Sequence, residues 1–118
     1  MKKSHIIESF LNFVKECEEI CVTSKANIEN EDKLTQDLLH KLELEDNTVL
    51  EEADIAKQLK DCRKRRREYK DEREIATCLE EWSSENQKCI EKLKQTLGKM
   101  RKTEEYHQNR IYNPKILH

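Results

Sequence analysis

Residues 6–42 read IIESFLNFVKECEEICVTSKANIENEDKLTQDLLHKL, and this stretch decides the fold. Apolar and small side chains recur along it in alternating steps of three and four, which places them on one face of a helix. No Gly or Pro interrupts the segment. The pattern predicts one long helix over residues 4–44. Its stripe comprises Ile7, Phe10, Val14, Cys17, Cys21, Ser24, Ile28, Glu31, Thr35, Leu38 and Leu42, widened by Ile6, Leu11, Phe13, Ile20, Leu34 and Leu39.

Local signals downstream of this helix predict two turns and two more helices. Thr48 and Glu51 match the capping box, in which a hydroxyl and a carboxylate each satisfy a free backbone N–H. Ser83-Ser84 with Gln87 offers a second such cap. Pro114 ends the regular structure because proline has no N–H to donate. The sequence thus predicts a single helical domain, residues 1–118, with helices over about 4–44, 49–82 and 85–108 and an irregular tail over 109–118.

The charge distribution predicts how these helices pack. Residues 1–55 carry 14 acids and 6 bases, whereas residues 56–118 carry 11 acids and 17 bases. Opposite charges on the two halves favour a fold-back, so we expect an all-α, antiparallel three-helix arrangement with long coiled-coil-like helices. A turn at residues 46–47 sets Glu29, Glu31 and Asp32 opposite Arg65, Arg63 and Cys62, and Phe10, Phe13 and Val14 near Trp82 and Leu79; a turn at residue 84 sets Leu93 near Ala76 and Ile90 near Cys78.

This register predicts an apolar core around Phe10, Trp82 and Ile90, another at the first turn, and a polar waist between them. It also brings four thiols to one level, namely Cys17, Cys21, Cys78 and Cys89, with Cys62 elsewhere. No pair has the close spacing of zinc-binding cysteines, and Cys packs well as a small apolar residue. We therefore expect core thiols, and neither a metal nor a cofactor.

Composition bounds the class of protein. The N-terminus has no apolar run that would make a signal peptide or a membrane span. An odd number of cysteines, five, spread through helical repeats indicates a reducing cytoplasm. Four scattered histidines and a lack of Gly-rich turns or nucleophile motifs argue against an enzyme.

The basic run over residues 60–70 is the first candidate binding site. Clustered Arg and Lys bind nucleic-acid phosphates by releasing counterions. Acids interleave the run, however, an acidic helix is predicted opposite, and the sequence pI is about 6.1. We favour a salt-bridged waist and keep nucleic-acid binding as an alternative. The candidate residues are Arg63, Arg65, Arg66, Arg67 and Lys70.

The tail is the second candidate site. It carries apolar residues but cannot be helical at Pro114. It either folds back to cap the bundle or docks on a partner as an extended segment. Its candidate binding residues are Arg110, Tyr112, Pro114 and Lys115.

One resemblance covers residues 60–117. A basic helix (residues 97–102) followed by residues 109–116, NRIYNPKI, is similar to the end of small helical accessory proteins encoded by phages and prophages of low-GC Gram-positive bacteria. The Arg-rich run leading into Tyr69 is similar too. This resemblance implies a setting, the cytoplasm of a bacterial host cell, and a mode of action in which the protein binds and modulates or inhibits a host factor, a defence system included.

The sequence therefore predicts a non-enzymatic helical module that binds another protein and does not associate with a membrane. The resemblance implies that this partner is a bacterial protein. Two alternatives stay open. One is a nucleic-acid-associated protein that uses the basic run, and the other is a homo-oligomeric structural coiled coil, for which a homodimer is the simplest form.

Overall fold

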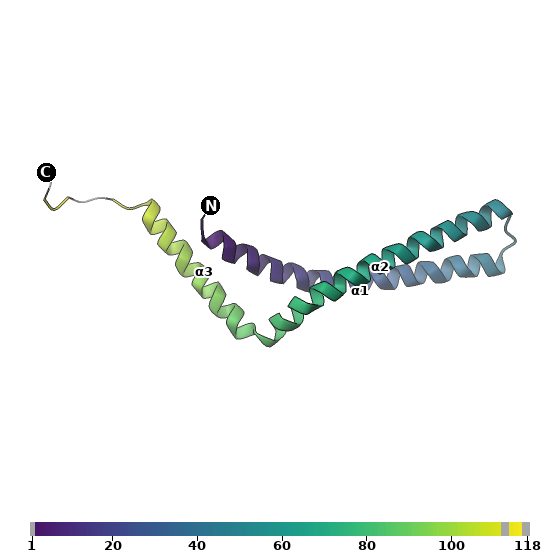
Figure 1. Ribbon diagram of the computed structural model, residues 1–118, viewed down its shortest axis with the longest axis horizontal. Coiled ribbons are helices and arrows are strands. Elements are labelled where there is room, and N and C mark those ends of the chain that lie inside the picture. The colour runs from purple at the N-terminus through teal and green to yellow at the C-terminus, as the bar shows by residue number, and fades with distance from the viewer. Residues whose placement is uncertain (1, 112–113, 117–118) are drawn as a thin grey trace.

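The apolar stripe of the N-terminal segment folds as one continuous helix, α1 (Ser4–Leu44), in the computed structural model, which describes residues 2–111 and 114–116. Two helices follow, α2 (Val49–Glu85) and α3 (Gln87–Gln108). The fold is all-α with three long helices, as predicted, and Figure 1 shows α1 and α2 as an antiparallel hairpin.

The seam of this hairpin follows the predicted heptad spacing. Val14, Cys17, Ser24 and Leu38 are the buried positions of α1 after its first turn. Successive buried positions of α2 are seven or fourteen residues apart, as Cys17, Ser24 and Leu38 are in α1. Each helix therefore keeps one narrow face against the other. The buried positions of α2 are Ile55, Cys62, Ala76 and Ser83.

The two turns differ from each other. At the first, the hydroxyl half of the predicted capping box is present, because the Thr48 hydroxyl accepts from the Glu51 N–H at 3.2 Å. At the second, the predicted cap is wrong: α2 continues through Ser83 and Ser84, and only Asn86 separates it from α3. The Asn86 amide donates to the Trp82 carbonyl at 2.8 Å and closes the last turn of α2.

The position of α3 corrects the predicted packing. Figure 1 shows that α3 turns away from α2 beyond Asn86 and runs toward the N-terminus of α1. Leu93 and Ile90 therefore do not pair with Ala76 and Cys78. The physical reason is the one-residue connection, which contains no loop that would lay α3 back along α2.

Two polar contacts attach the far end of α3 to the start of α1. Arg101 and Glu8 form an ion pair at 3.0 Å. Glu104 accepts the buried Ser4 N–H at 3.3 Å. Because α1 has neither a side-chain cap nor an acidic first turn of its own, Glu104 satisfies a helix N–H that would otherwise lack an acceptor.

The resulting molecule is long and thin. Its Cα atoms span 95 × 32 × 14 Å, and the radius of gyration is 25.9 Å, whereas a compact domain of this length has a radius of about 13 Å. A single layer of helices leaves much apolar surface exposed. Among the described residues, none of the helices combines the length and apolar character that crossing a membrane requires.

Candidate protein-binding surface

Four large side chains near the second turn form an exposed cluster, here called the aromatic corner: Ile6, Phe10 and Phe13 of α1 with Trp82 of α2. The three α1 residues are spaced i, i+4 and i+7, so they lie on one side of the helix. Phe10 meets Trp82 edge-to-face, with ring centroids 6.3 Å apart. Their exposed fractions are 63% for Ile6, 38% for Phe10, 52% for Phe13 and 41% for Trp82.

The sequence predicted this end as core, and only part of that prediction holds. Phe10 does contact Trp82, but both rings stay more than a third exposed. Ile90 of α3 is buried, as is Val14 of α1. Because α3 does not run back along α2, it leaves the aromatic corner uncovered.

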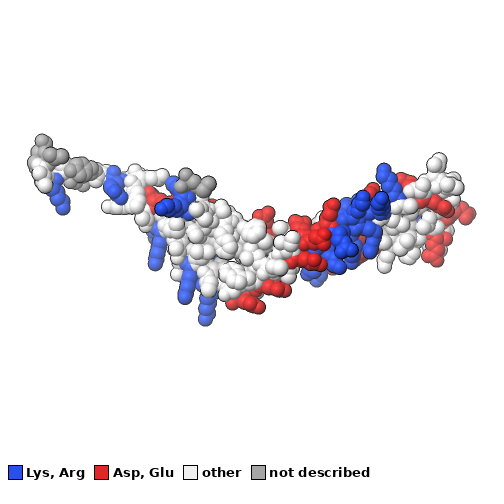
Figure 2. Space-filling model, viewed as in Figure 1, with Lys and Arg blue, Asp and Glu red and all other residues white. Residues whose placement is uncertain are grey.

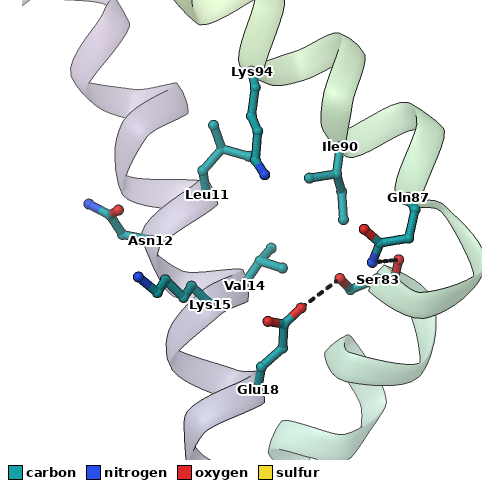
Figure 3. A pocket seen from close by; sticks show the side chains of 9 residues that line it. All are labelled: Leu11, Asn12, Val14, Lys15, Glu18, Ser83, Gln87, Ile90 and Lys94. Carbon is teal, nitrogen blue, oxygen red and sulfur yellow. Dashed lines mark hydrogen bonds between the residues drawn. The ribbon is translucent and has the colours of Figure 1, made fainter.

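A hollow at the junction of the three helices lies beside Val14 (Figure 3). Its volume is about 420 Å³. The Ser83 hydroxyl donates to Glu18 at 3.3 Å, and the Gln87 amide donates to the Ser83 carbonyl at 2.9 Å. In these two bonds, Glu18, Ser83 and Gln87 satisfy one another's polar groups. None of the lining residues forms a nucleophile–base pair. The lining comprises Leu11, Asn12, Val14, Lys15, Glu18, Ser83, Gln87, Ile90 and Lys94.

The basic run lies midway along the hairpin, where Figure 2 shows blue side chains flanked by red ones on both sides. Two of its arginines are paired with α1. Arg65 binds Glu31 through two hydrogen bonds of 2.8 and 3.2 Å, and Arg66 binds Asp32 at 2.7 Å. The hydrogen bond from Arg65 lowers the pKa of Glu31 below its ordinary value, and Cys62 adds to this effect.

The pairing partners correct the predicted register by two to four residues, about one helical turn. Glu31 meets Arg65 rather than Arg63, and Asp32 meets Arg66 rather than Cys62. The offset follows from the seam itself, because the heptad faces of both helices must point inward at the same level. The remaining candidate residues of the run, Arg63, Arg67 and Lys70, are exposed.

Cys62 holds the seam at this level, although the sequence analysis placed it outside the main thiol group. Its side chain is fully buried. The thiol donates to the Glu31 carbonyl at 3.1 Å and lies 3.2 Å from the Thr35 hydroxyl. Burial raises the pKa of the Cys62 thiol above its ordinary value, so it stays protonated at neutral pH.

The prediction that all four of these thiols are core residues is wrong for two of them. Cys17 is buried and Cys21 half-buried, but Cys78 and Cys89 are exposed. Within residues 2–111 and 114–116, no group of three or more His, Cys, Asp or Glu side chains is arranged to hold a metal ion.

The described residues of the tail do not cap the bundle. Ile111 is 80% exposed and Ile116 90% exposed, and Figure 1 shows this segment leading away from the helices. Arg110 lies over the Tyr106 ring, with its guanidinium carbon 5.8 Å from the ring centroid. Pro114 and Lys115 are exposed, and Tyr112 lies outside the described residues.

Comparison with known proteins adds no relative: no protein-family model matches the chain, and no curated protein or solved structure matches it significantly. The geometry of the molecule is therefore the basis for a functional proposal.

A sequence signal for the aromatic corner did exist, since Ile6 and Phe13 stand beside the heptad stripe rather than within it.

Proposed function

We propose that this protein is a non-enzymatic helical interaction module that docks its aromatic corner onto a protein partner. One observation carries the proposal: Ile6, Phe13 and Trp82 are each more than 40% exposed, and Phe10, on the same side of α1 as Ile6 and Phe13, contacts Trp82. Isolated exposed apolar residues are ordinary, but a cluster of large ones often marks an interaction site.

The chemistry of the corner suits protein recognition. Trp and other aromatic side chains are enriched in the small group of residues that dominate binding free energies. The spacing of Ile6, Phe10 and Phe13 is that of a helix which lays one face into an apolar groove. The corner presents few polar atoms that could bind a small metabolite or a phosphate. It is therefore better suited to insertion into an apolar groove of a protein partner.

The resemblance of residues 60–117 to phage and prophage accessory proteins supplies a setting for the proposal. In that setting the partner is a bacterial host factor, and binding modulates or inhibits it.

Nucleic-acid binding through the basic run is the weaker candidate. Arg65 and Arg66 are already engaged by Glu31 and Asp32, so less positive charge is free than the sequence suggests. Steering of a polyanion depends on uncompensated charge. In the aromatic corner, by contrast, Ile6 and Phe13 keep 63% and 52% of their surface exposed.

The test compares capture of proteins from a bacterial lysate by wild type and by two variants. Ile6→Ala/Phe13→Ala removes two exposed anchors, whereas Val22→Ala is a matched control that shortens another exposed apolar residue of α1, 73% exposed. We expect a protein that is retained by wild type and Val22→Ala and lost with the double variant.

Circular dichroism must show equal helix content in all three proteins, so that loss of capture reports the surface and not the fold. The candidate is then purified, and its affinity is measured by calorimetry. Anchors of this kind typically contribute at least about 2 kcal/mol each, so the double variant should bind more than about a hundredfold more weakly. Equal affinity of the double variant and wild type would refute the proposal.

A further inference from the structure

One side of α2, beside the seam with α1, carries a charge pattern that is complementary to itself. Glu52, Ala56, Leu59 and Arg63 follow one another in steps of four, three and four, and Lys70 lies seven residues after Arg63, so the five residues form one stripe along the helix. All are exposed except Leu59, which is half-buried. An acid thus lies on one side of an apolar centre and bases lie on the other.

We propose that this stripe pairs with the stripe of a second copy of the chain, across a two-fold axis that passes midway between Ala56 and Leu59. Such an axis makes α2 antiparallel to the partner's α2. Glu52 and Arg63 are equally far from the midpoint, so each Glu52 meets the Arg63 of the other copy. Ala56 meets Leu59 in the same way. A two-fold interface requires this self-complementarity, because the same patch serves both partners.

α1 adds an apolar residue at the same level. Leu39 lies seven residues after Asp32, so it occupies the same side of α1 as the Asp32–Arg66 ion pair, which borders the stripe. The same register places Leu39 beside Leu59, at the proposed axis. Leu39 is 48% exposed, which is unusual for a leucine next to a packed seam. Two copies would cover Leu39, Ala56 and Leu59 from each side.

The charges favour a second copy over a polyanion at this position. Neither Glu52 nor Arg63 takes part in an ion pair among the described residues. A nucleic-acid strand along the stripe would meet Glu52 and then the acidic tip of the hairpin, which repel its phosphates. A second copy instead offers its Arg63 to Glu52 and its Glu52 to Arg63. The tip carries Glu43, Glu45, Asp46, Glu51, Glu52 and Asp54.

This dimer is independent of the proposed function. It uses the half of the hairpin that contains the first turn, whereas the aromatic corner lies near the second turn. A two-fold axis at Ala56–Leu59 would place two aromatic corners at opposite ends of the assembly. Loss of the dimer would therefore leave each corner intact, and loss of the corner would leave the dimer intact.

The experiment is sedimentation equilibrium on the full chain over a range of concentrations, because one copy has a mass of 14.2 kDa and a dimer has twice that mass. Glu52→Arg sets Arg against Arg63 of the second copy, and Arg63→Glu sets Glu against Glu52. Each single variant should raise the dimer dissociation constant at least about tenfold, since like charges face each other at two symmetric sites. The combined variant Glu52→Arg/Arg63→Glu should restore association to near the wild-type level.

Lys57→Glu is the matched control, because it makes the same change as Arg63→Glu at the level of the axis but on another side of α2. It should leave the dissociation constant unchanged. A protein that is monomeric at all concentrations would overturn the proposal. So would a dimer that tolerates both single reversals or is not restored by the charge swap, and so would a monomer in which Arg63→Glu abolishes binding to duplex DNA.

Discussion

The two ends of the α1–α2 hairpin are built from the same two helices and differ in what their seam can bury. Near the first turn, Leu38 and Ile55 are almost fully buried, with 6% and 2% of their surface exposed. Near the second turn, Phe10 and Trp82 are 38% and 41% exposed, although they contact each other.

This difference teaches that a two-helix seam buries small and aliphatic side chains but not large rings. Much of the seam is lined by small residues, which let the helices approach closely and leave no room for an aromatic ring. Rings at neighbouring positions then lie outside, where only a third layer would cover them. The small buried residues are Ser4, Cys17, Ser24, Cys62, Ala76 and Ser83.

The largest expected effect separates the two ends directly. Ile55→Ala should lower the free energy of unfolding by about 2–5 kcal/mol, because it leaves a cavity in a closed seam. Phe13→Ala should change it by only about 0.5 kcal/mol, because the ring is 52% exposed. Urea titration followed by circular dichroism measures both. Equal losses in the two variants would show that the aromatic corner is part of the core.

The sequence predicts the first two helices well, because the heptad stripe spans α1 and Thr48 caps the start of α2. It predicts the hairpin register to within about four residues, because the acids of α1 and the arginines of α2 lie at similar distances along the chain from the loop that joins the two helices. The direction of α3 could not be read in the same way. It depends on Asn86, a single residue whose neighbours Ser83 and Ser84 imitate a cap.

The candidate surface was missed for the same reason. Phe10 and Trp82 were recognised as partners, but the prediction assumed that α3 would cover them. Whether a ring is core or surface depends on what lies over it, and only the direction of α3 decides that. The basic run shows the reverse case, since its pairing with acids of α1 followed from sequence alone.

The second prediction concerns the order in which the two ends unfold. Trp82 is the single tryptophan, so its fluorescence reports the end near the second turn, whereas circular dichroism reports all three helices. We expect the fluorescence transition at lower urea, because a segment with few buried apolar contacts opens before the closed seam. Arg101→Glu, which breaks the ion pair with Glu8, should widen the gap. Coincident transitions in both proteins would mean that the hairpin and α3 unfold as one unit.

The third prediction is an acid dependence with one contribution from the middle of the hairpin and one from the contact between α3 and the start of α1. Hydrogen bonds lower the folded-state pKa of Glu31, chiefly from Arg65, and of Glu104, chiefly from Ser4. A lowered pKa means that each carboxylate stabilises the fold fully above its ordinary pKa, and that this stability is lost as pH falls through the folded value. Thermal melting between pH 6 and pH 2.5 should show a falling midpoint below about pH 4.5.

The two carboxylates can be separated by variants and probes. Glu31→Gln should flatten the acid dependence of the circular dichroism signal, since that residue belongs to the hairpin seam. Glu104→Gln should flatten that of Trp82 fluorescence, since Glu104 holds α3 at the start of α1. An unaltered acid dependence in both variants would contradict the assignment of these hydrogen bonds.

The smallest expected effect tests whether the acids of α1 restrain the basic run. Wild-type protein should bind duplex DNA weakly, with a dissociation constant in the non-specific range of about 10⁻⁴ to 10⁻⁶ M, and increasing salt should weaken that binding steeply. Glu31→Gln/Asp32→Asn releases Arg65 and Arg66 from their ion pairs and should strengthen DNA binding about fivefold, an increment typical of exposed ion pairs.

Glu29→Gln is the control, because Glu29 makes no ion pair among the described residues and its removal changes net charge without freeing an arginine. Fluorescence anisotropy at several salt concentrations distinguishes the cases. If the control strengthens binding as much as the double variant, net charge alone is responsible and the pairing is irrelevant to DNA. Nanomolar, sequence-dependent binding by wild type would instead show that the exposed side of the run, with Arg63, Arg67 and Lys70, reads nucleic acid without any release from α1.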